Sequence, residues 1–217
     1  AQALGGGQTL IPTMKQRLAS PAMLVSLGGI AEMQGVVVDG GSLTIGGAVT
    51  HADVAAQASA YPVLAEMAGH IGDPAVRNRG TIGGSLANND PSADYPAAAL
   101  ASAATVVTNA REIAADDFFQ GMFDTALDEG EIITGAKFAV PMAASYQKFL
   151  QPASRFALVG VFVAKHSDGV RVAVTGASEE GVFRWSEAEA ALSADFSADA
   201  VAGLSLDPSG TIGDLHG

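Results

Sequence analysis

Short apolar runs separated by glycine predict strands that are joined by tight turns. The runs at 36–39 and 42–45 flank Gly40 and Gly41. A Gly-Gly pair readily takes the positive φ angles of a two-residue turn, so we expect a β-hairpin here. A further apolar run at 24–27 predicts a short strand, and the segment 105–114 has the pattern of a second hairpin.

Other segments have helical spacing. Thr50 is followed three residues later by Asp53, a capping box that predicts a helix over 50–60. In 62–71 the apolar residues fall on one helical face, and 97–104 is a run of small residues that fits a helix. The stretch 131–140 instead predicts a strand that ends at Pro141.

The segment 72–96 shows neither the apolar runs that indicate strands nor the helical spacing of apolar residues. It is rich in Gly, Asp, Asn, Pro and Arg and has few large apolar residues, so we expect a surface loop. A loop of this length inside a compact domain is uncommon unless it has a function. We therefore expect binding residues in this segment.

The part that follows Pro141 predicts a smaller α+β unit. The strands are expected at 155–165 and 170–175, and the helices at 187–192 and 198–204. The sequence thus predicts two domains of α+β class, one over residues 1–141 and one over residues 142–217.

Composition restricts the chemistry. The chain has 217 residues, of which 48% are hydrophobic and 16% charged, which is enough to bury a core. It contains no cysteine, which excludes disulfides, thiol catalysis and iron–sulfur clusters held by this chain alone. The four histidines, at positions 51, 70, 166 and 216, are scattered, so we expect no protein-bound metal.

The net charge of −12 argues against nucleic acid as a partner, because phosphate backbones attract an excess of Lys and Arg. No apolar run is long enough to span a membrane, and the first residues do not have the pattern of a signal peptide. We therefore expect a cytoplasmic protein without a membrane span.

Two glycine-rich loops are the strongest candidates for binding. They read Gly5-Gly6-Gly7-Gln8-Thr9 and Thr81-Ile82-Gly83-Gly84-Ser85. A backbone without Cβ atoms can approach an anion closely and turn successive N–H groups toward it. In so acidic a chain, anion binding has to come from such groups and from local cations such as Arg77 or Arg79. Arg77 is also expected to buttress the loop through backbone carbonyls.

Three ordered segments resemble one family. They are Gly-Gly-Gly-Gln-Thr-Leu at 5–10, Pro-Ala-Val-Arg-Asn-Arg-Gly-Thr-Ile-Gly-Gly-Ser at 74–85, and Asp-Pro-Ser-Ala-Asp-Tyr-Pro at 90–96. Together with 116–119, 130–133 and 154–157, they resemble the FAD-binding medium subunit of the molybdenum hydroxylases, which include carbon monoxide dehydrogenase and bacterial xanthine dehydrogenase.

The resemblance implies an FAD-binding domain of the vanillyl-alcohol-oxidase-like (PCMH) type, followed by a smaller C-terminal α+β domain. Asp94 would accept a hydrogen bond from a sugar hydroxyl of FAD, and Ile133 would pack near the flavin. The pyrophosphate would lie between two groups of residues: Gly5, Gly6, Gly7, Gln8 and Thr9 on one side, and Thr81, Gly83, Gly84 and Ser85 on the other. The family extends beyond both ends of this sequence, so each domain is expected to be incomplete.

For some of these residues the sequence also allows a structural role. Asp94 precedes Tyr-Pro and could instead be the N-cap of the following helix. Tyr95 and Phe156 are expected in the core or at the rim of the site, where one of them could contact the flavin ring.

The leading functional hypothesis is an electron-transfer subunit. FAD would receive electrons from an iron–sulfur small subunit and pass them to an acceptor, and a large subunit would hold the molybdenum cofactor. No catalytic side chain is expected in this chain, because the flavin supplies the chemistry. The alternatives are a self-contained FAD-dependent oxidase or reductase, and a non-redox nucleotide-binding or scaffold relative.

Overall fold

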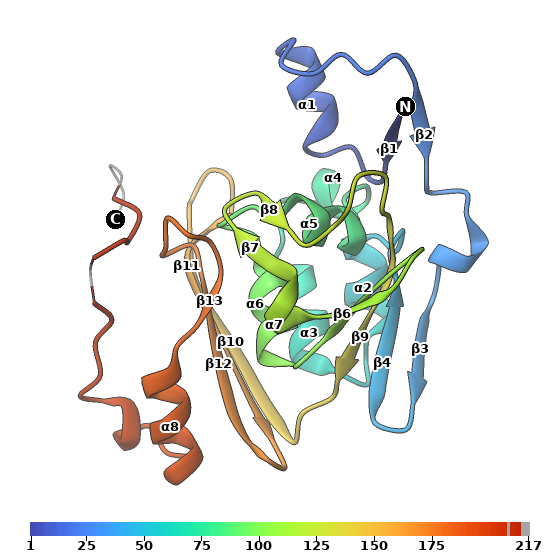
Figure 1. The fold of residues 1–217 in the computed structure, drawn as a ribbon. Coiled ribbons are helices and arrows are strands. Elements are labelled where there is room, and N and C mark those ends of the chain that lie inside the picture. The colour runs from blue at the N-terminus through green and yellow to red at the C-terminus, as the bar shows by residue number, and fades with distance from the viewer. Residues whose placement is uncertain (208, 214–217) are drawn as a thin grey trace.

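The computed structural model describes residues 1–207 and 209–213. Two antiparallel sheets flank a layer of short helices, and a small two-stranded unit with helix α1 stands at one end of this layer (Figure 1). Among the described residues, no helix is long and apolar enough to cross a bilayer.

The first sheet has five strands in the order β3-β4-β9-β5-β6, with every neighbouring pair antiparallel. Gly40 and Gly41 have φ angles of 55° and 85°, so the expected hairpin with a two-residue turn is confirmed. The expected second hairpin and the strand before Pro141 are also present. The strands are β3 (Val36–Asp39), β4 (Ser42–Gly46), β5 (Thr105–Thr108), β6 (Glu112–Ala114) and β9 (Ile133–Ala139).

The second sheet has four strands in chain order, and its outer face is covered by helix α8 (Ser186–Ala194). Val170 and Val172 pack there against Ala188 and Leu192. The helix expected at 198–204 is wrong in extent, because only one 3-10 turn, Asp199–Val201, forms there. The strands are β10 (Ala143–Leu150), β11 (Ala157–His166), β12 (Gly169–Thr175) and β13 (Phe183–Arg184).

The expected loop over 72–96 is wrong, because most of this segment is helical. Each of its helices is short, which hides its periodicity in the sequence. Asp73 and Thr81 accept hydrogen bonds from Val76 and Gly84, and so cap two of these helices at their first turn. The helices between the sheets are α2 (His51–Gln57), α3 (Pro62–Gly69), α4 (Pro74–Arg77), α5 (Ile82–Asn88), α6 (Asp94–Ala101) and α7 (Ala115–Phe118).

One hydrophobic core extends over both sheets. Every residue of α6 is buried, and Phe162 and Ala173 of the second sheet belong to the same buried cluster as Leu43 of the first. The short link from β9 to β10 contains the predicted boundary at 141, which stays a prediction; the core continues across it.

The N-terminal unit projects the first glycine loop toward the helical layer (Figure 1). Strand β1 (Gln2–Leu4) pairs in parallel with β2 (Leu24–Ser26), and helix α1 (Leu10–Lys15) connects them. The loop 5–9 therefore lies between the end of β1 and the start of α1. The remaining short elements are η1 (Ala31–Met33), β7 (Phe119–Gly121) and β8 (Asp124–Thr125).

Candidate functional site

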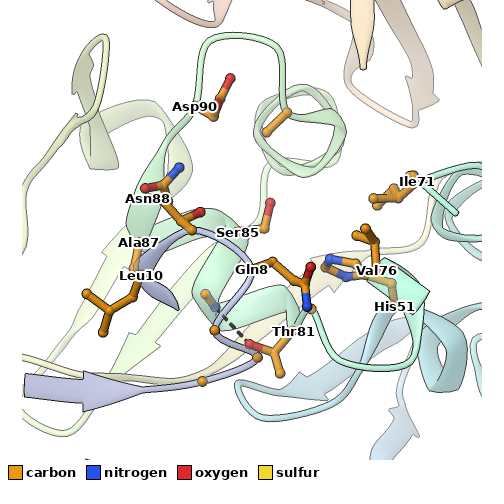
Figure 2. Close-up of a pocket in the computed structure, with 18 of the residues that line it drawn as sticks. Gln8, Leu10, His51, Ile71, Val76, Thr81, Ser85, Ala87, Asn88 and Asp90 are labelled. Atoms are coloured by element: carbon orange, nitrogen blue, oxygen red, sulfur yellow. Dashed lines mark hydrogen bonds between the residues drawn. The ribbon is translucent and has the colours of Figure 1, made fainter. Parts of the chain in front are cut away.

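A cavity of about 490 Å³ opens where the two glycine loops meet. Its walls come from the loop 5–9, the start of α1, the segment before α4, helix α5 and the segment that follows β10. Figure 2 shows Gln8 of the first loop, Ile71 and Ser85 around one space, although they come from distant segments of the chain. Of the expected site residues, this cavity brings together Gly5, Gly6, Gly7, Gln8, Thr9, Thr81, Gly84, Ser85 and Asp94.

Glycine is required in the first loop because the loop packs directly on backbone. A Cβ on Gly6 would lie 1.9 Å from the carbonyl oxygen of Arg79 and 2.6 Å from the Cα of Gly80. Gly7 has a φ of 74°, a conformation that other residues rarely adopt. The first loop therefore rests against the segment that leads into the second.

Among the described residues, the backbone N–H groups of the loop 5–9 have no hydrogen-bond partner. Within the described residues, no hydrogen bond uses the N–H of Gly5, Gly6, Gly7, Gln8 or Thr9. All of these residues line the cavity. A run of unpaired backbone N–H groups can bind an anion.

The second loop differs from the expectation, because the protein already uses its N–H groups. Ile82 and Gly83 donate to the carbonyls of Val49 and Gly47, at 3.1 and 3.0 Å. Gly84 donates to the hydroxyl of Thr81, the N-cap of α5, at 3.1 Å. What this loop presents to the cavity is therefore the side chains of Thr81 and Ser85.

The two loops share the hydroxyl of Thr81. A Cβ on Gly5 and a Cβ on Gly84 would each lie 2.9 Å from Thr81 Oγ1, so both backbones approach the same atom. The oxygen accepts from Gly84, and the hydroxyl hydrogen has no acceptor in the described part of the chain. Thr81 thus joins the loops and retains one donor.

Asp94 lies at the first turn of α6 with 4% of its surface exposed. Tyr146 donates a hydrogen bond to its carboxylate, and Lys148 Nζ lies 3.0 Å from Oδ1. Burial raises the pKa of Asp94, against the opposing effects of Lys148 and Tyr146. The alternative as an N-cap is wrong, because Ala93 occupies that position and the carboxylate is bound to the second sheet instead.

Gly83 and Ile133 are not among the lining residues. Gly83 packs against Gly47, whose carbonyl oxygen would lie 2.6 Å from an added Cβ. Ile133 begins β9 and is buried in the main core. The predicted role of Ile133 beside the flavin stays a prediction.

The two arginines expected to supply local positive charge are close to the loops but are not part of the cavity wall. Neither Arg77 nor Arg79 lines the cavity. Arg77 donates to the carbonyls of Ile71 and Gly72 at 3.2 and 2.8 Å, so its expected role as a buttress is confirmed. Arg155 is the lining residue with a cationic side chain.

The sequence pattern alone did not indicate several of the lining residues. His51 is the first residue of α2 and is 5% exposed; its ring lies 5.3 Å from that of Tyr95, which is in the core. Burial, with a smaller effect of Arg77, lowers the pKa of His51 to about 4. The capping box at Thr50 located His51 at a helix start but could not show what it faces. Others are Leu10, Ile71, Gly72, Val76, Asn88, Asp90, Ser154 and Arg155. Phe156, which was expected in the core or at the rim of the site, is half-exposed and lines the cavity.

Similarity to known proteins is extensive. Residues 1–142 match the family described as "FAD binding domain in molybdopterin dehydrogenase". The carbon monoxide dehydrogenase medium chain of Hydrogenophaga pseudoflava is 33% identical over 199 residues, which cover 85% of this chain and 69% of that one. The nicotine 6-hydroxylase medium subunit of Paenarthrobacter nicotinovorans is 36% identical, with 80% and 66% covered.

A second medium chain, from the carbon monoxide dehydrogenase of Afipia carboxidovorans, is 40% identical over 148 residues, or 65% of this chain and 51% of that one. The chain thus spans between about half and about two thirds of the length of these curated relatives.

Solved structures show the same fold. Carbon monoxide dehydrogenase from Hydrogenophaga pseudoflava superposes with a TM-score of 0.83 at 34% identity, covering 92% of this chain and 75% of that one. Quinoline 2-oxidoreductase from Pseudomonas putida 86 superposes with a TM-score of 0.79 at 28% identity, covering 99% and 81%. The expected PCMH-type α+β fold and the FAD cofactor are confirmed. The chain belongs to the FAD-binding medium subunits of the molybdenum hydroxylases.

Proposed function

We propose that FAD occupies the cavity at the glycine loops, and that this chain conducts electrons from an iron–sulfur partner through FAD to an acceptor. The observation that supports this best is the unbroken run of unpaired N–H groups from Gly5 to Thr9. Such a run fits the pyrophosphate of a dinucleotide, because the oxygens of two phosphates accept several hydrogen bonds and the loop offers several adjacent N–H donors.

Different lining residues would bind different parts of FAD. The backbone of 5–9 would bind the pyrophosphate, and the hydroxyls of Thr81 and Ser85 would add donors from the opposite side. Asp94 would accept from a sugar hydroxyl, with its carboxylate already fixed by Lys148. Apolar side chains such as Ile71 and Phe156 would cover the flavin ring and keep water from it.

Bound FAD supplies the electron transfer chemistry, and the chain supplies binding and orientation. The charges of the lining support a role for the backbone. Among the described lining residues Asp90 offsets the charge of Arg155, and Asp94 is paired with Lys148, so the side chains give the cavity no net positive charge that would attract an anion. The N–H groups of the first loop would provide the attraction.

Partner subunits would carry the other redox centres. The sequence has no cysteine for a cluster, and the described residues contain no group of His, Asp or Glu placed to hold a metal. Several relatives are named as medium chains or subunits of larger enzymes. We infer that an iron–sulfur small subunit and a molybdenum-binding large subunit complete the enzyme, and that it works in the cytoplasm.

A pair of glycine variants tests the cofactor site. Gly6→Ala places a Cβ on the carbonyl of Arg79 and displaces the loop, whereas Gly29→Ala meets nothing within 4 Å and is the matched control. We expect Gly6→Ala to weaken FAD binding at least tenfold, or about 1.4 kcal/mol, and Gly29→Ala to leave it unchanged. Equal FAD titrations for both variants would contradict the site.

Reconstitution tests the role in the complex. The purified chain with FAD should be reducible by a chemical donor but inactive toward hydroxylase substrates. Activity should appear only after an iron–sulfur subunit and a molybdenum subunit are added. Steady turnover of an organic substrate by this chain and FAD alone would favour the self-contained oxidase.

A further inference from the structure

His51 has a buried ring whose two nitrogens are in different surroundings. Nδ1 is sealed from solvent and has no hydrogen-bond partner. Nε2 also has no partner among the described residues, but it is not sealed, and His51 is part of the cavity wall. Figure 2 shows the ring among the lining side chains, together with Val76, Gln8 and Thr81. Nε2 is therefore the nitrogen that the cavity reaches.

The proton of this imidazole belongs on Nε2. A sealed N–H without an acceptor costs more than a sealed lone pair, and neutral imidazole has one of each. With a pKa of about 4, the ring is neutral at pH 7. Its Nε2–H is then a donor at the cavity wall that has no acceptor in the described protein.

Packing holds this donor beside the first loop. A Cβ on Gly80 would lie 2.5 Å from Nε2 of His51, and a Cβ on Gly6 would lie 2.6 Å from the Cα of Gly80. The His51 ring also packs against the buried ring of Tyr95. The donor is therefore close to the unpaired N–H groups of the loop, and its direction is fixed by neighbours on both sides.

We propose that His51 is a positioning residue for the cofactor, whose Nε2–H donates a hydrogen bond to an acceptor atom of bound FAD. The proposal rests on the proposed function, because it needs FAD in this cavity. It extends the binding site beyond the two glycine loops to the first residue of α2. The bound FAD satisfies a donor that the protein leaves open.

Three variants separate this role from simple packing. His51→Phe keeps a ring against Tyr95 and removes both nitrogens. His51→Gln keeps an N–H at a similar distance from the backbone. Tyr95→Phe is the matched control, because it alters the same ring pair by removing a buried hydroxyl that has no partner and is not part of the cavity wall.

FAD titration and thermal unfolding without FAD give the two readouts. We expect the dissociation constant of FAD to rise about tenfold in His51→Phe, with no loss of stability in the FAD-free protein. His51→Gln should stay within about threefold of the wild type, and Tyr95→Phe should equal it. A changed flavin absorption band in His51→Phe would place the acceptor on the isoalloxazine ring, and an unchanged band would place it in another part of FAD.

Wild-type affinity in His51→Phe would overturn the proposal, as would an equal loss of affinity in Tyr95→Phe. These results are distinguishable from failure of the proposed function. If the wild-type chain binds FAD and Gly6→Ala weakens it, the site stands and only the role of His51 is lost. If the wild type binds no FAD, both are lost.

Discussion

At the residue scale, the glycines of the two loops serve different purposes that the sequence presents as one pattern. Gly6 permits contact with the carbonyl of Arg79, Gly83 permits contact with Gly47, and Gly7 supplies a positive φ. Close backbone approach was predictable from composition. Which N–H groups remain unpaired was not, because the acceptors for the second loop, Gly47 and Val49, come from a distant segment.

Asp94 is expected to contribute to both stability and FAD binding. Asp94→Ala alone would leave Lys148, whose side chain is 7% exposed, without its partner, at a cost of about 3–5 kcal/mol. The paired variant Asp94→Ala/Lys148→Met removes both charges and should recover most of this stability. We expect it to bind FAD at least tenfold more weakly than the wild type, since a hydrogen bond to a charged group contributes about 1.5–3 kcal/mol.

Urea unfolding and FAD titration of both Asp94 variants provide the measurement. Lys148→Met alone is the control for the loss of the cation. If the paired variant is stable and binds FAD as tightly as Lys148→Met, Asp94 has a structural role only.

The low pKa of His51 predicts a pH dependence of stability. The folded protein holds the ring neutral, with a pKa of about 4 against an ordinary value of 6.5, because of burial and Arg77. Below pH 6.5 the unfolded chain binds a proton at His51 that the folded protein does not bind. The free energy of unfolding is therefore unaffected by protonation of His51 above pH 6.5 and decreases as the pH falls toward 4. At pH 4.5 the loss should be about 2 kcal/mol.

Unfolding of wild type and His51→Phe at pH 7 and pH 4.5 isolates this effect, since other acidic groups act equally in both proteins. The wild type should lose about 2 kcal/mol more than the variant between the two pH values. Equal losses would show that the pKa of His51 is the same in the folded and the unfolded protein.

At the element scale, the elements whose turn or cap residues are close together in the sequence were predicted correctly. The Gly-Gly turn and the Thr50–Asp53 capping box specified a hairpin and a helix, and both formed. The helical content of 72–96 was missed, because α5 contains two adjacent glycines that oppose helix formation. Its cap at Thr81 and its packing on the first sheet stabilise it, and this packing cannot be read from the segment itself.

Thr81 should show two separable effects. Thr81→Ala removes the cap of α5, and Asp73→Ala removes the comparable cap of α4 without altering the cavity lining. Each should cost about 1 kcal/mol of unfolding free energy. Only Thr81→Ala should weaken FAD binding, because it also removes a hydroxyl on which both loops pack. Matching FAD affinities for the two variants would mean that Thr81 is a cap and nothing more.

At the scale of the whole molecule, the cavity exists because distant parts of the chain meet. The resemblance predicted the two loops and Asp94, and these do lie around one cavity. The contribution of 154–156 depends on β10, a strand that was not predicted from the sequence and that ends at Leu150, a few residues before this segment. Phe149 and Leu150 at the end of β10, and Phe156 in the cavity wall, are exposed.

Backbone amide resonances of the ¹⁵N-labelled chain, recorded during an FAD titration, test whether the first glycine loop binds the cofactor. We predict large shifts and slowed hydrogen exchange for Gly5, Gly6, Gly7, Gln8 and Thr9, whose N–H groups are unpaired in the free protein. Gly83, which donates to Gly47, should keep its hydrogen bond, and Gly29 should not shift. If FAD saturates the protein and the amide resonances of residues 5–9 do not change, the first loop does not bind FAD.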